Sequence, residues 1–212
     1  MLPHHRDATW VFIGDSITDS GRHDDPASIG DGYFQLVRNY LLAKAPADLP
    51  NLINVGTSGN TVRHLADRWD DDVLAHKPDV LSVMIGINDV WRQIDKQDTP
   101  VYIEDYTRTY DELLAKVVSQ NAAVRLVLCE PTVISPPAAT NGNELLLPYV
   151  MTVRELAEKF AGNVSAVVPM HETCLAAERD RPDIAWWPDG VHPAEPGKML
   201  LARTWLAATE SL

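Results

Sequence analysis

Residues 9–18, Thr-Trp-Val-Phe-Ile-Gly-Asp-Ser-Ile-Thr, begin with an uncharged, mainly apolar run and continue with a glycine and several polar side chains. The run Thr9–Ile13 has the length and composition of a strand that is buried on both faces of a sheet. Four similar runs follow along the chain, namely Leu52–Val55, Val80–Ile85, Val124–Cys129 and Val164–Val168. The sequence therefore predicts five buried strands.

Segments with the apolar spacing of helices separate these runs. The apolar side chains between Tyr33 and Leu41 form one stripe, those between Tyr106 and Val117 form another, and Lys198–Ala208 closes the chain. This alternation predicts an α/β fold with a flavodoxin-like, three-layer α/β/α architecture, in which helices cover both faces of a five-stranded parallel sheet. Because the chain has no internal repeat and no shift in composition, we expect residues 1–212 to form a single domain.

The charge and the cysteine count restrict the partners and the compartment. With 18 Lys and Arg against 30 Asp and Glu, the net charge is −12, which phosphate backbones and anionic membrane surfaces repel. We therefore expect neither a nucleic acid nor a membrane as partner. The two cysteines, Cys129 and Cys174, are too few for a disulfide framework and lack the spacing of a zinc site. Together with the lack of a signal-peptide pattern, they predict a cytoplasmic protein.

Polar residues and glycines follow the first three predicted strands. Ser16 follows the first, Gly59 lies in the turn after the second, and Asn88 follows the third. Each has a simpler interpretation by itself, because Ser is a common helix N-cap and the other two segments are typical of turns. In a flavodoxin-like strand order, however, these strands are neighbours and their carboxyl ends converge at the edge where ligands bind.

A further candidate lies near the end of the chain, in Asp189-Gly190-Val191-His192 between two prolines. The carboxylate and the imidazole are three positions apart in the sequence. This spacing lets Asp189 fold back onto one ring nitrogen of His192 and leaves the other nitrogen free. Histidine titrates near neutral pH, so His192 is a candidate general base.

Taken in order, Gly14–Thr18, Gly59, Gly86–Asp89 and Asp189-x-x-His192 resemble the four sequence blocks of the SGNH (GDSL-type) hydrolases. The blocks span nearly the whole chain. Additional stretches resemble the bacterial intracellular acetylxylan esterases of that family, namely Asp19-x-Gly21-Arg22, Ser58–Arg63, Arg68-Trp69 and Met84–Gln93.

The resemblance implies a serine ester hydrolase with the SGNH hydrolase fold, and elementary chemistry is consistent with each role. Ser16 is the expected nucleophile, His192 the base that accepts its proton, and Asp189 the group that fixes the imidazole tautomer. The backbone N–H groups of Ser16 and Gly59 and the side-chain amide of Asn88 are the expected donors of an oxyanion hole. We expect Asp15 to organise the turn beneath Ser16, and Asp89 to cap the helix that follows it.

Several tryptophans and arginines lie close in sequence to these blocks. Trp91, Trp186 and Trp187 present flat apolar faces with a polar N–H, which suits stacking on sugar rings, although packing around the pocket is an equally good interpretation. Arg22 and Arg92 are candidates for hydrogen bonds to sugar hydroxyls or for ion pairs. We expect the remaining tryptophans to lie in the core, namely Trp10, Trp69 and Trp205.

The predicted activity is the removal of O-acetyl groups from short carbohydrates such as acetylated xylo-oligosaccharides, without a cofactor or metal. Two alternatives stay open: a short-chain aryl or lipolytic esterase or thioesterase of the same fold, and a metal-dependent phosphoesterase. A metal site would need clustered carboxylates and histidines. Asp70–Asp72 and Asp24-Asp25 are instead typical of solvated charge. A non-catalytic flavodoxin-like binding module is a further alternative. The resemblance also implies a homo-oligomer.

Overall fold

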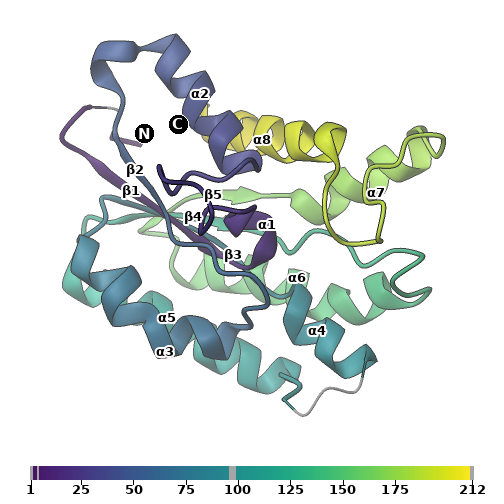
Figure 1. Cartoon of the computed structure of the whole chain (residues 1–212). Helices are drawn as coiled ribbons and strands as arrows, with labels where there is room; N and C mark the ends of the chain where they lie inside the picture. The colour runs from purple at the N-terminus through teal and green to yellow at the C-terminus, as the bar shows by residue number, and fades with distance from the viewer. Residues whose placement is uncertain (1, 4, 96–98, 211–212) are drawn as a thin grey trace.

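The computed structural model describes residues 2–3, 5–95 and 99–210. Its five strands form one parallel sheet in the order β2-β1-β3-β4-β5 (Figure 1), which is the flavodoxin-like order. The strands are β1 (Thr9–Gly14), β2 (Asn51–Asn54), β3 (Val80–Met84), β4 (Arg125–Cys129) and β5 (Val164–Val168). The predicted fold class is therefore confirmed, with strand ends within one residue of the sequence-based bounds.

The prediction that every strand is buried on both faces is wrong for the two edge strands. In β2 and β5 most residues are partly exposed, whereas β3 is buried throughout. An edge strand has a neighbour on one side only, so its outer margin stays in contact with solvent.

Helices cover both faces of the sheet. Figure 1 shows α2 and α8 packed together on one face and α3, α5 and α6 on the other. The α-helices are α1 (Ser16–Asp19), α2 (Tyr33–Lys44), α3 (Val62–Asp72), α4 (Ile87–Ile94), α5 (Ile103–Gln120), α6 (Gly142–Lys159), α7 (Met170–Asp180) and α8 (Glu195–Glu210), with short 3₁₀ turns η1 (Pro46–Asp48) and η2 (Leu74–His76).

An aromatic cluster joins β1 to α2 and α8. Phe12 of β1 lies between Phe34 and Trp205, at ring-centroid distances of 5.0 and 5.1 Å. The indole N–H of the buried Trp205 donates to Ser82 Oγ at 3.0 Å, so its polar atom is satisfied. Trp10, Trp69 and Trp205 are all buried, as expected. This core supports β1, from whose end the nucleophile turn begins.

Within the described ranges, none of the helices combines the length and the apolar character needed to cross a membrane.

Candidate active site

The turns after β1, β2 and β3 meet at the carboxyl edge of the sheet, because these strands are adjacent. They bring together Ser16 at the start of α1, Gly59 in the loop before α3, and Asn88 in the first turn of α4. The segment before α8 completes the site with Asp189 and His192. All five predicted residues of the triad and the oxyanion hole therefore gather in one place, although the sequence separates them widely.

Asp15 holds the turn that carries Ser16. It is the N-cap of α1, and its buried carboxylate accepts a hydrogen bond from the Ile17 N–H at 3.0 Å. Ser16 is therefore the first residue of the helix and not its cap, which overturns the simpler interpretation of Ser16. A short helix that begins at the nucleophile directs its unpaired N–H groups towards the place where negative charge would develop.

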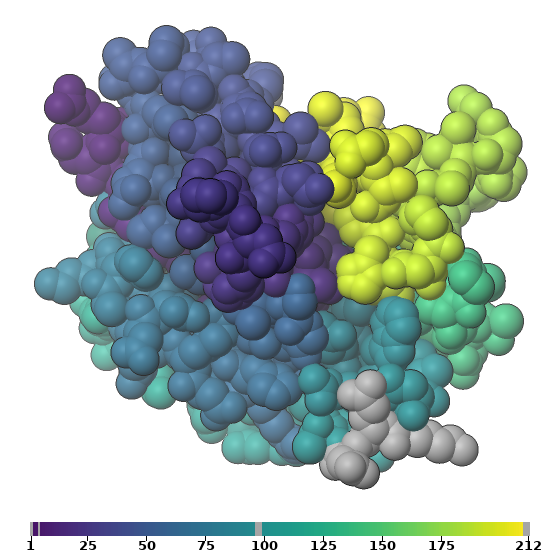
Figure 2. Space-filling view, in the orientation of Figure 1, coloured from purple at the N-terminus to yellow at the C-terminus, as the bar shows by residue number. Residues whose placement is uncertain are grey.

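Ser16, His192 and Asp189 form a continuous chain of hydrogen bonds. Ser16 Oγ lies 2.8 Å from His192 Nε2, and His192 Nδ1 lies 2.6 Å from Asp189 Oδ2. The first pair joins residues 176 positions apart. Figure 2 shows the N-terminal segment beside the start of α8 on the molecular surface, where Lys198 pairs with Asp31 at 3.2 Å. The site thus combines a segment from the first part of the sequence with one from its last part.

Hydrogen bonds within the segment from Asp189 to His192 hold it in a tight turn. Asp189 Oδ1 accepts hydrogen bonds from the N–H groups of Val191 at 2.9 Å and His192 at 2.7 Å. Its partial burial acts to raise the pKa of Asp189, but the hydrogen bonds from the His192 ring and from the two backbone N–H groups outweigh burial, so the pKa is lowered. Asp189 is therefore ionised at neutral pH. The side chains of His192 and Asp189 are about half exposed, at 49% and 52%.

Asn88 is oriented by one of its two amide hydrogens. Its Nδ2 donates to the Asn60 carbonyl at 3.0 Å, next to Gly59 in the chain. This bond fixes which way the amide points and leaves its second hydrogen for another acceptor. Among the described hydrogen bonds, the N–H groups of Ser16 and Gly59 donate to no acceptor either. Three donors are thus available around Ser16 Oγ.

Asp19 and Arg68, which the sequence placed in stretches of family resemblance without assigning them a role, hold the loop that contains Gly59. Asp19, at the end of α1, accepts from Ser58 N at 3.0 Å and Ser58 Oγ at 2.6 Å. Arg68 of α3 donates to the Gly14 carbonyl at 3.2 Å and to Asn60 Oδ1 at 2.7 Å. Their partners are mostly backbone atoms of distant turns, so composition and spacing carry no signal for these roles.

Asp89 differs from its expected role. It lies inside α4, fully buried, and accepts from the N–H of Val62, the first residue of α3, at 3.0 Å. It therefore caps the preceding helix and not its own. Burial raises the pKa of Asp89 to about 7, and burial likewise raises the pKa of Asp15 to about 6. Each has one carboxylate oxygen without a hydrogen-bond partner among the described residues.

A cavity of about 300 Å³ opens beside the predicted oxyanion donors. Trp91 and Arg92 of α4 line it, so these two candidates lie where a substrate would be expected. The complete lining is Gly59, Asn88, Trp91, Arg92, Asp95, Val191 and His192.

The other three candidates for substrate contact lie elsewhere. Trp187 is buried in the core, with 5% of its surface exposed, because it packs against the start of α8 at Gly197. Trp186 lines a separate groove between α7 and α8, and its indole N–H donates to the Arg181 carbonyl at 3.0 Å. Arg22 donates to the Gly56 carbonyl and to Thr57 Oγ1, so it holds the loop after β2.

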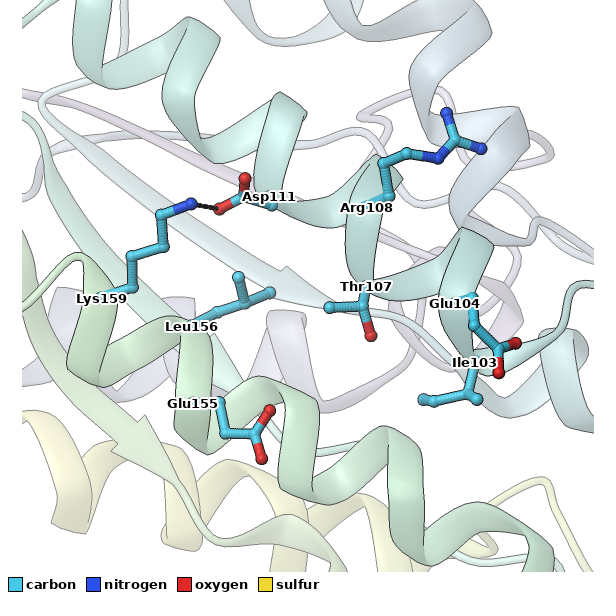
Figure 3. A pocket seen from close by; sticks show the side chains of 8 residues that line it. All are labelled: Ile103, Glu104, Thr107, Arg108, Asp111, Glu155, Leu156 and Lys159. Atoms are coloured by element: carbon cyan, nitrogen blue, oxygen red, sulfur yellow. Dashed lines mark ion pairs between the residues drawn. The ribbon is translucent and has the colours of Figure 1, made fainter.

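The groove of about 530 Å³ between α5 and α6 is larger than the cavity at the triad, but none of the predicted site residues lines it (Figure 3). Its walls are charged, and Lys159 pairs across it with Asp111 at 2.6 Å. The part of the chain that the structure describes contains no group of three or more His, Cys, Asp or Glu side chains suited to a metal ion.

Comparison with known proteins agrees with this site. Residues 12–200 match the model of the GDSL-like lipase/acylhydrolase family. The chain is 36% identical over 208 residues to an acetylxylan esterase of Geobacillus stearothermophilus, covering 92% of this chain and 91% of the relative.

Solved structures are similar over nearly the whole length. A protein of Parabacteroides merdae assigned as a GDSL-like lipase superposes with a TM-score of 0.88 at 33% identity, covering 97% of both chains. The crystal structure of a Geobacillus stearothermophilus acetylxylan esterase superposes with a TM-score of 0.84 at 33% identity, covering 98% of this chain and 96% of that one. The chain belongs to the GDSL-like lipase/acylhydrolase (SGNH) family of carboxylic ester hydrolases, as its four sequence blocks predicted.

Proposed function

We propose that this protein removes O-acetyl groups from short carbohydrates such as acetylated xylo-oligosaccharides, through an acyl-enzyme on Ser16. The observation that carries the proposal is the hydrogen-bonded chain from Ser16 Oγ to His192 and on to Asp189. The acetylxylan esterase relative supports the substrate class.

The chain of hydrogen bonds accounts for both halves of the reaction. His192 Nε2 accepts the hydroxyl proton while Ser16 Oγ attacks the ester carbonyl, and the imidazolium then donates that proton to the departing sugar oxygen. In the second half His192 takes a proton from water, which attacks the acetyl carbonyl; the bond to Ser16 Oγ then breaks, acetate leaves, and the imidazolium returns the proton to Ser16 Oγ. The ionised Asp189 stabilises the imidazolium in both halves.

Each half passes through a tetrahedral intermediate with negative charge on the former carbonyl oxygen. The Ser16 and Gly59 N–H groups and the free amide hydrogen of Asn88 supply the donors for this oxygen. Donors that are already in place when charge develops are worth roughly 3–4 kcal/mol each in comparable sites.

The cavity beside the donors suits a sugar as the alcohol part of the ester. Its volume is about 300 Å³, and it combines the ring of Trp91 with the polar side chain of Asp95. Carbohydrate sites pair a flat apolar surface with hydrogen-bonding groups in this way.

The decisive experiment measures acetate released from acetylated xylo-oligosaccharides by the parent, by Ser16→Ala and by Ser119→Ala. Ser119 is exposed on α5, so it is a matched control for loss of a serine hydroxyl. We expect fast release by the parent and the control and none by Ser16→Ala. Cleavage of an aryl acetate without cleavage of the sugar esters would keep the nucleophile and overturn the carbohydrate assignment.

Two further assays address the alternatives. A series of acyl lengths and of aryl, thioester and sugar leaving groups distinguishes an acetylesterase from a short-chain aryl esterase or a thioesterase. Full esterase activity after chelator treatment would exclude the metal-dependent phosphoesterase.

We also propose a cytoplasmic location and a homo-oligomeric state. The free thiols of Cys129 and Cys174 support a reducing compartment, and the oligomer rests on family resemblance alone. Cell fractionation and light scattering on the purified protein test the two statements.

A further inference from the structure

The Gly59 donor lies in a loop that makes hydrogen bonds with the side chains of Asp19, Asn88 and Arg92. Gly59 has a φ of +79°, and a Cβ built on it would meet no atom within 4 Å. Gly59 has no side chain of its own to pack against its surroundings, and a glycine leaves its two flanking peptide planes free to turn. Something else must hold the Gly59 N–H towards the oxyanion.

Hydrogen bonds hold the loop on both sides of this N–H. On the N-terminal side, Asp19 accepts from the N–H and the hydroxyl of Ser58. On the C-terminal side, Arg92 Nη2 donates to the Gly59 carbonyl at 2.9 Å, and Asn88 donates to the next carbonyl, that of Asn60, at 3.0 Å. Arg92 is thus the side chain that hydrogen-bonds to Gly59 itself.

Arg92 is itself held in position. Its other terminal nitrogen, Nη1, donates to Thr99 Oγ1 at 3.0 Å, so the planar guanidinium bridges the Gly59 carbonyl and the Thr99 hydroxyl. A planar guanidinium with two hydrogen-bonded nitrogens loses less conformational entropy when it binds than a lysine ammonium group would. Arg92 also lies on α4, one turn after Asn88, so one helix controls two of the three donors.

We propose that Arg92 is a positioning residue of the oxyanion hole, which acts through the Gly59 carbonyl and does not bind the sugar. This inference rests on the proposed function. It predicts that loss of the guanidinium slows turnover without weakening the binding of substrate. The slowing is the same for every acetate ester, because acylation and deacylation both develop the same oxyanion.

The test compares Arg92→Met with Arg63→Met in steady-state hydrolysis of an aryl acetate and an acetylated xylo-oligosaccharide. Arg63 is a matched control: it loses the same charge, and it contacts the same segment, pairing with Asp105 at 2.6 Å and donating to the Pro100 carbonyl at 3.5 Å. Active-site titration with a phosphonate ester corrects each rate for the fraction of intact enzyme.

We expect Arg92→Met to lower kcat about 10- to 100-fold on both esters, somewhat less than complete loss of one donor. KM stays within about twofold, because ground-state binding does not use the oxyanion geometry. The inhibition constant of an arylboronic acid, which forms a tetrahedral adduct on Ser16, rises by the same factor as kcat falls. Arg63→Met keeps parent values of all three quantities.

A rise in KM confined to the sugar ester, with kcat unchanged, would overturn the inference and make Arg92 a sugar-binding residue. If Arg92→Met has parent-like kinetics and Ser16→Ala is inactive, the inference about Arg92 is overturned and the proposed function stands. If Ser16→Ala is active, the proposed function is overturned as well. If Arg92→Met does not fold, Arg92→Lys replaces it. The single ammonium donor then gives a smaller loss, again in kcat and not in KM.

Discussion

At the scale of single residues, the open position of the triad sets the relative importance of its members. In the proposed mechanism Ser16 and His192 take part in bond making and proton transfer, whereas Asp189 acts on the imidazole from a half-exposed position. Water reaches an exposed carboxylate and screens its charge. Water is therefore able to replace part of what Asp189 does, and nothing replaces the nucleophile.

We accordingly expect Ser16→Ala and His192→Ala to lower kcat by about 10⁴- to 10⁶-fold, and we expect a clearly smaller decrease in kcat for Asp189→Ala. The measurement is hydrolysis of an aryl acetate by purified variants at pH 7.5, with folding checked by circular dichroism. Equal losses in Asp189→Ala and Ser16→Ala would contradict the argument from exposure.

Asn88 supplies the side-chain donor of the proposed oxyanion hole. Since its bond to the Asn60 carbonyl already orients the amide, the second hydrogen is available without rearrangement. Asn88→Ala should lower kcat by about 10²- to 10³-fold and leave KM nearly unchanged. A change confined to KM would show that Asn88 binds the substrate instead.

At the scale of elements, the loop that carries Asp189 and His192 depends on the loop that follows β4. The Ser135 N–H donates to the Gly190 carbonyl at 2.9 Å, and Ser135 Oγ donates to Glu178 of α7. Gly190 has a φ of +87°, and a Cβ there would lie 2.1 Å from the Ser135 carbonyl oxygen. The two loops approach so closely that only glycine fits between them.

Gly190→Ala is therefore expected to destabilise the protein by about 2 kcal/mol or more and to lower kcat, because the added methyl pushes the triad loop away from Ser16. Urea unfolding and aryl acetate kinetics measure the two effects. Gly162→Ala is the matched control, since a Cβ there meets no atom within 4 Å and its φ is not in the left-handed region. A stable, fully active Gly190→Ala would contradict the close approach.

At the scale of the whole molecule, two buried carboxyls beneath the site make stability depend on pH. Burial raises the pKa of Asp89 from 3.8 to about 7. Between these two values the folded state retains a proton that the unfolded state releases. The free energy of unfolding contributed by Asp89 therefore falls as the pH rises from about 4 to about 7, and is constant outside this window.

Asp89→Asn removes this titration. Relative to Asp89→Asn, the parent should lose stability between pH 4 and pH 7.5, by up to about 4 kcal/mol for a shift of this size. Urea unfolding at a series of pH values measures the difference. Asp70→Asn, which removes an exposed carboxylate from α3 and keeps Asp89, should lose stability over this pH range as the parent does. If the difference in the free energy of unfolding between the parent and Asp89→Asn does not change with pH, Asp89 is ionised in the folded state over this whole range.

The sequence by itself determined the strands, the parallel order and the four motif blocks. Strand formation follows from short apolar runs, and the convergence of Ser16, Gly59 and Asn88 follows once β1, β2 and β3 are neighbours. The hydrogen bond between the His192 ring and the Asp189 carboxylate joins residues three positions apart, so local sequence reasoning predicted it too.

Only the tertiary structure decided which neighbouring side chains serve the site. Trp187 and Trp91 are equally close to motif blocks, yet Trp187 packs in the core beside α8 and Trp91 lines the cavity. Asp89 caps α3 and not its own helix, and Arg92 grips the Gly59 carbonyl. The physical reason is that these contacts join segments distant in sequence, whose relative path is set by how the whole core packs and not by local composition.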